Sequence, residues 1–133
     1  MSQENVEIIR AVAAAVSRGD WDAALSYVAP DVKWDISRQL NETRGIYETR
    51  EGVRRVWERF AEPWESWRIE ADEFVPVGED TVVTRGTGYF RGRDGIEVTA
   101  RQSGVWTFRD GAVSEFTSYD DHQEALEAAG LRE

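Results

Sequence analysis

Three consecutive runs of alternating side chains, joined by two Asp-Gly pairs, constrain the fold more than any other part of this sequence. They predict strands over residues 81–90, 96–108 and 112–119. Asp94-Gly95 and Asp110-Gly111 fill the breaks, and Asp-Gly between alternating runs is the strongest short-range signal for a hairpin. A long antiparallel sheet must bury at least one of its faces. We therefore expect the rest of the chain to cover one side of these strands.

The lengths of the two turns decide which side chains share a face. If Asp94-Gly95 is a two-residue loop, Arg93 lies opposite Ile96. One face then carries Val83, Arg85, Thr87 and Tyr89 from the first strand and Ala100, Gln102, Gly104 and Trp106 from the second. If residues 109–111 form a three-residue loop, Ser114, Phe116 and Ser118 join that face. A shift of one residue would turn a whole row to the opposite side of the sheet.

The predicted face is chemically mixed, with aromatic side chains toward one end and polar ones toward the other. Its polar members are Arg85, Thr87, Gln102 and Ser118. Two interpretations stay open: the wall of a partly hydrated pocket, or a packing face whose polar half meets solvent.

Composition limits the classes of protein and partner. A chain of 133 residues suits one domain, residues 1–133. Because Cys is absent, disulfides and thiolate chemistry are excluded, and the cytoplasm is the expected compartment. A single histidine, His122, excludes a His-rich metal site, and we expect no metal. The net charge of -10 argues against nucleic acid or an anionic membrane surface as a partner. No apolar run is as long as a membrane span, and the first residues lack the apolar core of a signal peptide.

The remaining elements follow from periodicity. Apolar residues at helical spacing predict helices over residues 3–18, 21–28 and 50–64, and alternation predicts strands over 31–36 and 67–77. The polar stretch 37–49 is predicted as a loop of the length that often forms a lid or a binding loop. Asp121 and Glu124 are spaced as a capping box, which predicts a last helix that ends at Gly130. Six Trp residues suit a pocket with large walls or a dimer face, although a tightly packed small core would use them too.

This order of elements resembles the NTF2-like superfamily and, within it, the SnoaL-like branch. Five stretches carry the resemblance: RGDWDAAL at 18–25, DVKW at 31–34, GIY at 45–47 followed by REGV at 50–53, VWTFRDG at 105–111 and EALEAAG at 124–130. The resemblance implies an α+β cone, in which a curved antiparallel sheet wraps around three N-terminal helices and a short C-terminal helix follows. It also implies a pocket at the open end for a small apolar organic ligand, and a homodimer through the outer face of the sheet.

On this reading the mixed face looks inward and helix 50–64 closes the pocket. The expected pocket residues are Trp34, Ile36, Trp57, Phe60, Arg85, Thr87, Tyr89, Gln102, Gly104, Trp106, Phe116 and Ser118. The expected dimer face comprises Val82, Thr84, Phe90, Arg101, Val105 and Thr107.

The acid/base sets of known relatives fit these residues poorly. Ketosteroid isomerase-like members would place a general base at Ile36, a Tyr at Val12 and a protonated Asp at Gly104, and none of the three is present. Asp35 is next to the base position, but strand alternation turns it to the other face. Limonene epoxide hydrolase-like members would match their Arg at Arg85 but place an Asp at Ser118.

SnoaL-like cyclases use an inward Asp and an inward His. His122 falls at a helix start, which is usually exposed, and Asp120 is the best remaining carboxylate. Asp120 is therefore the candidate catalytic residue, and as a base near neutral pH it would need a pKa raised by burial. The alternative is that Asp120 and Asp121 serve the start of the last helix.

Arg85 stays open between an anion-binding pocket residue and a surface ion pair. The resulting expectation is a small-molecule pocket protein. If it is an enzyme, the reaction is a cofactor-free isomerisation, cyclisation or dehydration by proton transfer on a polyketide- or steroid-like ring. The alternative is a non-catalytic ligand-binding or dimeric interaction module.

Overall fold

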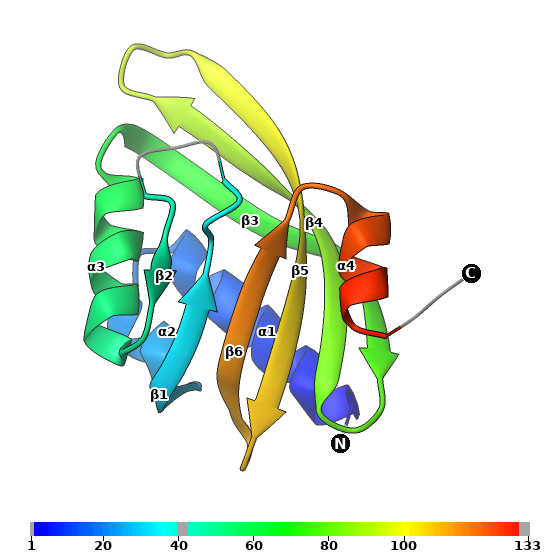
Figure 1. The fold of residues 1–133 in the computed structure, drawn as a ribbon. Helices are drawn as coiled ribbons and strands as arrows, with labels where there is room; N and C mark the ends of the chain where they lie inside the picture. The colour runs from blue at the N-terminus through cyan, green and yellow to red at the C-terminus, as the bar shows by residue number, and fades with distance from the viewer. Residues whose placement is uncertain (1, 40–42, 131–133) are drawn as a thin grey trace.

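The computed structural model describes residues 2–39 and 43–130 of the chain (Figure 1). Its helices are α1 (Ser2–Ser17), α2 (Trp21–Leu25), α3 (Arg50–Ala61) and α4 (His122–Ala128). Its strands are β1 (Val28–Asp35), β2 (Ile46–Tyr47), β3 (Trp64–Val77), β4 (Thr81–Gly92), β5 (Glu97–Arg109) and β6 (Ala112–Tyr119).

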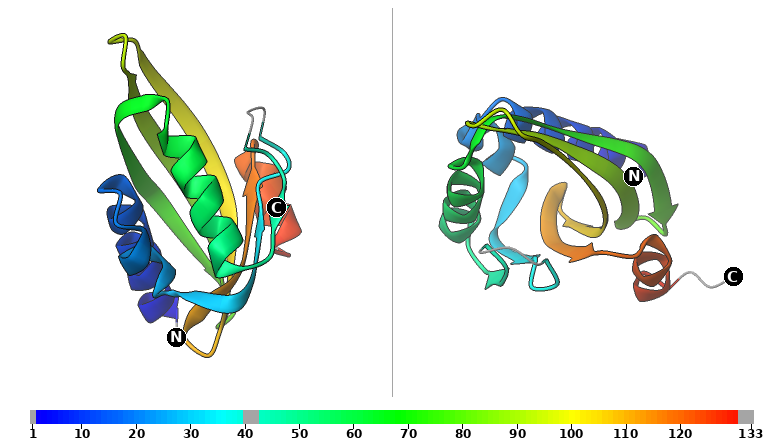
Figure 2. Two further views of the ribbon diagram at one scale, coloured as in Figure 1. Left: turned by 90° about the vertical axis from the view of Figure 1, so that its left-hand side faces the viewer. Right: turned by 90° about the horizontal axis from the view of Figure 1, so that it is seen from above.

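All six strands form one curved sheet in the order β2-β1-β6-β5-β4-β3. Seen from above, the sheet bends round, with α3 and α4 at opposite ends of the molecule (Figure 2). This confirms the predicted α+β architecture. The sheet is not wholly antiparallel, because β1 pairs with β6 in parallel. The predicted loop 37–49 also contains the short strand β2, which pairs with the end of β1, while residues 40–42 lie outside the described residues.

Several boundaries differ from prediction because pairing with the sheet outweighs the helical pattern. The helix predicted over 21–28 stops at Leu25, since the Tyr27 carbonyl accepts the Val113 N–H (2.8 Å) and draws the chain into the sheet. The helix predicted to reach Trp64 ends at Ala61, ahead of Pro63, which lacks the N–H needed to continue it. Strand β3 therefore starts at Trp64, opposite Gly92. Helix α4, which was predicted to end at Gly130, ends at Ala128.

The β4–β5 turn corrects the predicted register. Arg91 lies opposite Glu97, and the Gly92 N–H donates to the Ile96 carbonyl (2.8 Å), so the loop has three residues rather than two. Gly95 takes the left-handed conformation (φ 87°) that closes such a loop, whereas Asp94 does not. The one-residue difference turns the whole of β4 over. The predicted dimer-face residues Val82, Thr84 and Phe90 are consequently buried on the inside.

The β5–β6 turn differs in the opposite sense but leaves the predicted face intact. Asp110 (φ 54°) and Gly111 (φ 77°) form a two-residue loop, with Arg109 opposite Ala112. A bulge at Ser114 then shifts the register, so that Trp106 pairs with Phe116 and Gly104 with Ser118. The predicted sharing of one face by these four residues is confirmed.

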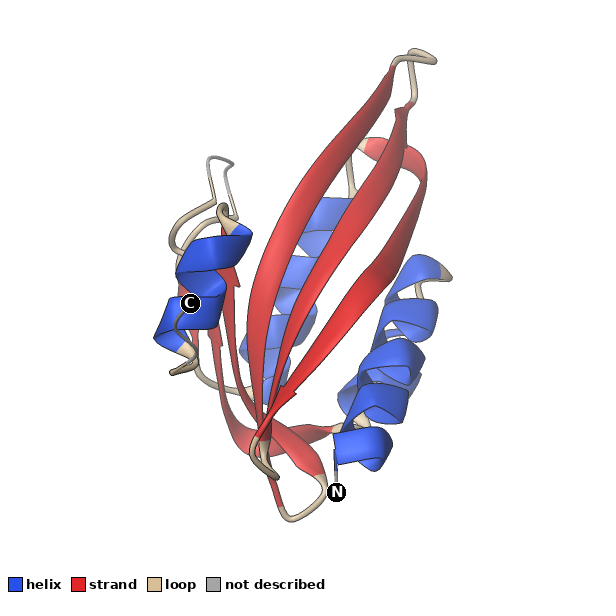
Figure 3. Cartoon of the chain, turned by 90° about the vertical axis from the view of Figure 1, so that its right-hand side faces the viewer, coloured by secondary structure: helices blue, strands red, loops and turns tan. Residues whose placement is uncertain are grey.

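Helices cover the two faces of the sheet differently. Helix α1 lies along β3 and β4, and α3 faces β1, so the main core forms on the concave side. The short α4 instead packs on the convex side, where Ala125 is fully buried and Ser103 lies under the helix start. The β4–β5 hairpin extends past the other elements (Figure 3). Within the described residues, no helix has the length and apolarity to cross a membrane.

Candidate functional site

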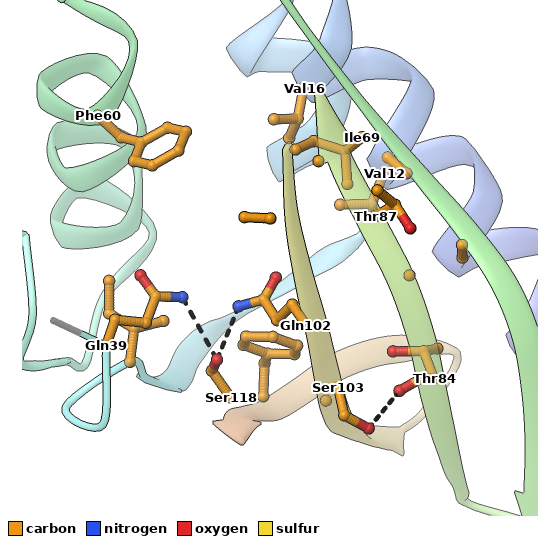
Figure 4. Close-up of a pocket in the computed structure, with 18 of the residues that line it drawn as sticks. Val12, Val16, Gln39, Phe60, Ile69, Thr84, Thr87, Gln102, Ser103 and Ser118 are labelled. Carbon is orange, nitrogen blue, oxygen red and sulfur yellow. Dashed lines mark hydrogen bonds between the residues drawn. The ribbon is translucent and has the colours of Figure 1, made fainter. Parts of the chain in front are cut away.

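A cavity of about 430 Å³ lies between the concave face of the sheet and the helices (Figure 4). This volume is in the range of small-molecule sites. One wall comes from α1 and one from α3: Ile9, Val12, Ala13 and Val16 from the first, Val56, Trp57 and Phe60 from the second. The helical walls are thus entirely apolar.

A cluster of four aromatic side chains forms another wall. Trp34 stacks on Phe116 with ring centroids 4.4 Å apart, and it meets Trp57 and Trp106 edge-on at 5.4 and 5.7 Å. The indole N–H of Trp106 donates to the Thr84 hydroxyl (3.0 Å), which removes its need for a partner in the cavity. Together these rings offer flat surfaces and edges to a ring-shaped guest.

Two glycines on the concave face, Gly104 and Gly88, leave room for neighbouring phenyl rings. A Cβ on Gly104 would lie 2.5 Å from the ring of Phe116, and one on Gly88 would lie 2.5 Å from the ring of Phe90. Real Cβ atoms do not approach carbon this closely, so the two phenyl rings rest against bare backbone. Without the glycines the rings would move into the cavity.

The polar part of the lining is electrically neutral at its centre. The side-chain amides of Gln102 and Gln39 both donate to the Ser118 hydroxyl oxygen, at 2.7 and 3.3 Å (Figure 4). Ser118 is 1% exposed. Because amides and hydroxyls can both donate and accept, this cluster can orient an oxygen or nitrogen of a neutral ligand.

Most of the predicted pocket residues line the cavity. These are Trp34, Ile36, Trp57, Phe60, Thr87, Gln102, Gly104, Trp106, Phe116 and Ser118. The hydroxyl of Thr87 donates to Asp72 (3.2 Å). Asp120 also lines the cavity, although its side chain is solvent-exposed.

Arg85 and Tyr89 were expected in the pocket but lie on the convex face, because the three-residue turn reverses β4. The guanidinium of Arg85 lies 3.6 Å from Glu73, in an exposed ion pair. The ring of Tyr89 stacks under Arg68, with 4.3 Å from the guanidinium carbon to the ring centroid. Arg85 thus takes the surface role that the sequence had left open.

Sequence reasoning missed the α1 wall, Gln39, and the inward row of β4. That row comprises Thr84, Gly86, Gly88 and Phe90. The two glycines were a usable signal, since alternating glycines inside a strand indicate a bend or a close approach of another group. Had they been read this way, they would have favoured the register that the structure adopts.

The two titratable side chains that follow Asp120 in the sequence have structural partners. Asp121, rather than Asp120, caps α4 by accepting the Gln123 N–H (2.9 Å). His122 lies on the convex side, with Nδ1 2.8 Å from the Ser103 hydroxyl oxygen. Since that hydroxyl donates to the Thr84 carbonyl (2.7 Å), its oxygen accepts from the imidazole Nδ1–H.

Asp35 is held by its own turn and does not line the cavity. Burial raises the pKa of Asp35, but hydrogen bonds from the Ser37 hydroxyl (2.6 Å) and N–H (3.0 Å), together with Arg38 and Lys33, outweigh it and leave this pKa below its ordinary value. No group of three His, Cys, Asp or Glu side chains suited to a metal ion occurs among the described residues.

Comparison with known proteins agrees with this architecture. The family model described as a SnoaL-like domain matches residues 9–116. An NTF2-like protein of unknown function from Burkholderia pseudomallei K96243 has 23% sequence identity and a TM-score of 0.77, with 96% of this chain and 98% of that chain covered. No curated protein matches the sequence.

Two further solved structures are similar over nearly their full length. TerC, co-crystallised with polyporic acid, has 25% identity and a TM-score of 0.77, covering 96% of this chain and 99% of that one. A protein from Xanthomonas campestris pv. campestris, proposed to be a polyketide cyclase, has 20% identity and a TM-score of 0.71, covering 97% and 98%. With the family model matched over most of its length, the chain belongs to the SnoaL-like domain family.

Proposed function

We propose that the protein binds a neutral, largely apolar ring compound of the polyketide or steroid type in the concave cavity. The observation that carries this proposal is the pairing of an aromatic wall with an uncharged polar cluster in one cavity of about 430 Å³. A buried anion would need a cation or several donors to offset its desolvation. Arg85, the cation expected for that role, is on the other face.

The co-crystallisation of the related TerC with polyporic acid supports an organic guest in this fold. The test is a titration of the protein with neutral polycyclic compounds, in which the quenching of tryptophan fluorescence measures binding. Trp34, Trp57 and Trp106 all line the cavity and would report occupancy. We expect saturable quenching at micromolar concentrations.

A matched pair of variants on α1 separates the cavity from the surface. Ala13 lines the cavity, whereas the neighbouring Ala14 is exposed and does not. Ala13→Phe places a ring in the cavity and should abolish saturable binding, while Ala14→Phe should leave it unchanged. Equal binding by both variants would move the ligand site elsewhere and refute the proposal.

A second function, proton transfer, is favoured by one observation: Asp120, an acidic residue, is part of the cavity lining. It would remove a proton next to a carbonyl of the bound ring, as in a cofactor-free isomerase, cyclase or dehydratase. NMR detection of deuterium exchange at such carbons of a ring ketone tests this without knowledge of the natural substrate. Exchange that Asp120→Asn abolishes would support catalysis, whereas absence of exchange with binding intact would favour a non-catalytic binding module.

The homodimer also stays a proposal, now with a smaller face. Of the residues expected on it, Arg101, Val105 and Thr107 remain on the convex side of β5. Helix α4 covers part of that side, and β5 runs along it for 13 residues. Sedimentation at high protein concentration tests this, and a monomer there would contradict it.

A further inference from the structure

Ser118 stands out among the hydroxyl groups of the sheet because of what its oxygen receives. Two N–H groups reach this oxygen, from Gln102 at 2.7 Å and from Gln39 at 3.3 Å. A serine hydroxyl has two lone pairs and one proton. Both lone pairs are therefore occupied, and the proton is the remaining hydrogen-bonding group of this side chain.

The proton of Ser118 has no acceptor among the residues that the structure describes. Other serines of the sheet donate to backbone carbonyls, Ser103 to Thr84 at 2.7 Å and Ser114 to Thr107 at 3.1 Å. Ser118 makes no such bond, although it is 1% exposed and lines the cavity. An unpaired buried donor is costly, so a guest that supplies an acceptor is favoured over one that does not.

The two amides also improve Ser118 as a donor. Each N–H that points at the hydroxyl oxygen draws electron density from it, and hydrogen bonds in such a chain strengthen one another. The side chain of Phe116, two residues earlier on the same face, lies beside it in the stacked aromatic wall. A ring that lies against this wall would bring a substituent at its edge toward Ser118.

We propose that Ser118 donates a hydrogen bond to a carbonyl oxygen of the ligand, which makes flat ring ketones and quinones the ligand class of this cavity. The inference rests on the proposed function. A carbonyl oxygen accepts without bringing a proton of its own, so it complements a site whose free group is a donor. A ligand hydroxyl would bring a second proton that needs its own acceptor.

The experiment compares two tricyclic compounds of nearly equal shape, 9-fluorenone and the hydrocarbon fluorene, by equilibrium dialysis below their solubility limits. Wild-type protein should bind fluorenone about five- to tenfold more tightly, which corresponds to one buried hydrogen bond. The infrared carbonyl band of bound fluorenone should lie below its frequency in a hydrocarbon solvent.

Ser118→Ala should remove most of the preference by weakening fluorenone binding, with fluorene binding kept. Ile69→Val, a change of one methyl group in the apolar lining, should shift both affinities by the same factor. If Ser118→Ala does not fold, the wild-type preference and the infrared band still decide the matter.

The outcomes separate the two proposals. Failure of both compounds to bind would overturn the cavity as the functional site. Binding of both with equal affinity and an unshifted carbonyl band would overturn the role of Ser118 alone. A full preference for the ketone in Ser118→Ala would assign the carbonyl to another donor, such as the Gln102 amide, and would likewise overturn it.

Discussion

The two faces of the β4–β5 pair differ in charge although their residues alternate along the same strands. On the concave face the row of Gly104, Gln102 and Trp106 carries no charge. On the convex face Arg85 pairs with Glu73 (3.6 Å), and Arg68 pairs with Glu70 (2.6 Å) and covers Tyr89. The fold therefore places ion pairs in solvent, where desolvation is avoided. The charged residues of the cavity lining, Glu70, Arg101 and Asp120, are likewise exposed, and the buried part of the lining is uncharged.

This contrast shows why the turn length matters for function. A two-residue β4–β5 loop would have placed Arg85 in the cavity and turned Gly86 and Gly88 outward. The three-residue loop places the glycines inside. At Gly88 the lack of a Cβ makes room for the ring of Phe90, and at Gly86 it makes room for the backbone oxygen of Glu70 on β3, 2.5 Å from where a Cβ would lie. The neutral character of the site thus depends on one residue in a turn.

The largest difference between the faces should appear when a large side chain is removed from each. Trp34→Ala deletes a ring that is 6% exposed and touches three others, so we expect a loss of about 3–5 kcal/mol in the free energy of unfolding. Tyr89→Ala removes a half-exposed ring and should cost about 1 kcal/mol or less. Urea unfolding of both variants measures this, and similar losses would erase the distinction.

A smaller difference in the free energy of unfolding should separate a concave position of β5 from an exposed one. Gly104→Ala forces the Phe116 ring to move, which should cost about 1–3 kcal/mol and narrow the cavity. Its control, Thr99→Ala at an exposed position opposite Tyr89 that does not line the cavity, should stay within about 0.5 kcal/mol of wild type. A Gly104→Ala variant with unchanged stability and unchanged tryptophan fluorescence would show that this wall is loosely packed.

The convex ion pair should contribute little. Arg85→Ala breaks a solvent-exposed pair and should change the free energy of unfolding by about 0–1 kcal/mol. It should also leave the affinities of acidic and neutral ligands equally unchanged. A selective loss of acidic ligands in titrations would return Arg85 to the binding site and contradict the observed register.

The smallest effect expected is a pH-dependent one at Asp35, which does not itself line the cavity. Its pKa is lowered in the folded protein, so its contribution to stability is present above about pH 3.8, its ordinary value, and is lost as the pH falls through the lower, folded value. Asp35→Asn should therefore be less stable than wild type at pH 7, with the difference shrinking in acid. If the difference in the free energy of unfolding between the two proteins stays constant across this pH range, the prediction is wrong.

Local signals in the sequence were sufficient for most of the architecture. The cap at Asp121, the positions of the Asp-Gly turns and the periodic helices are local features, and they form where the sequence indicates. The shared face of Trp106, Phe116 and Ser118 was also predicted, although its turn was misread. The bulge at Ser114 restored the predicted pairing of β5 with β6, and no local sequence pattern predicts this bulge.

What could not be predicted depends on contacts between distant segments. An Asp-Gly pair fits both a two- and a three-residue loop, and the choice is settled by which row of β4 can pack under α1 and beside Phe116. The parallel pairing of β1 with β6 and the contact of Gln39 with Ser118 join residues 79 or more positions apart. Such pairings follow from closure of the whole sheet, not from the sequence near either partner.

The central claim, that the cavity accepts a neutral ring, is tested most directly with two ligands that share one ring system and differ in charge. Titration of the protein at pH 7 with 9-fluorenone and with a fluorenone carboxylate, followed by tryptophan fluorescence, compares nearly equal shapes. We predict that the neutral ketone binds at least about tenfold more tightly, because the cation in the lining, Arg101, is solvent-exposed and the buried part of the lining is uncharged. Equal or tighter binding of the carboxylate would contradict a neutral cavity.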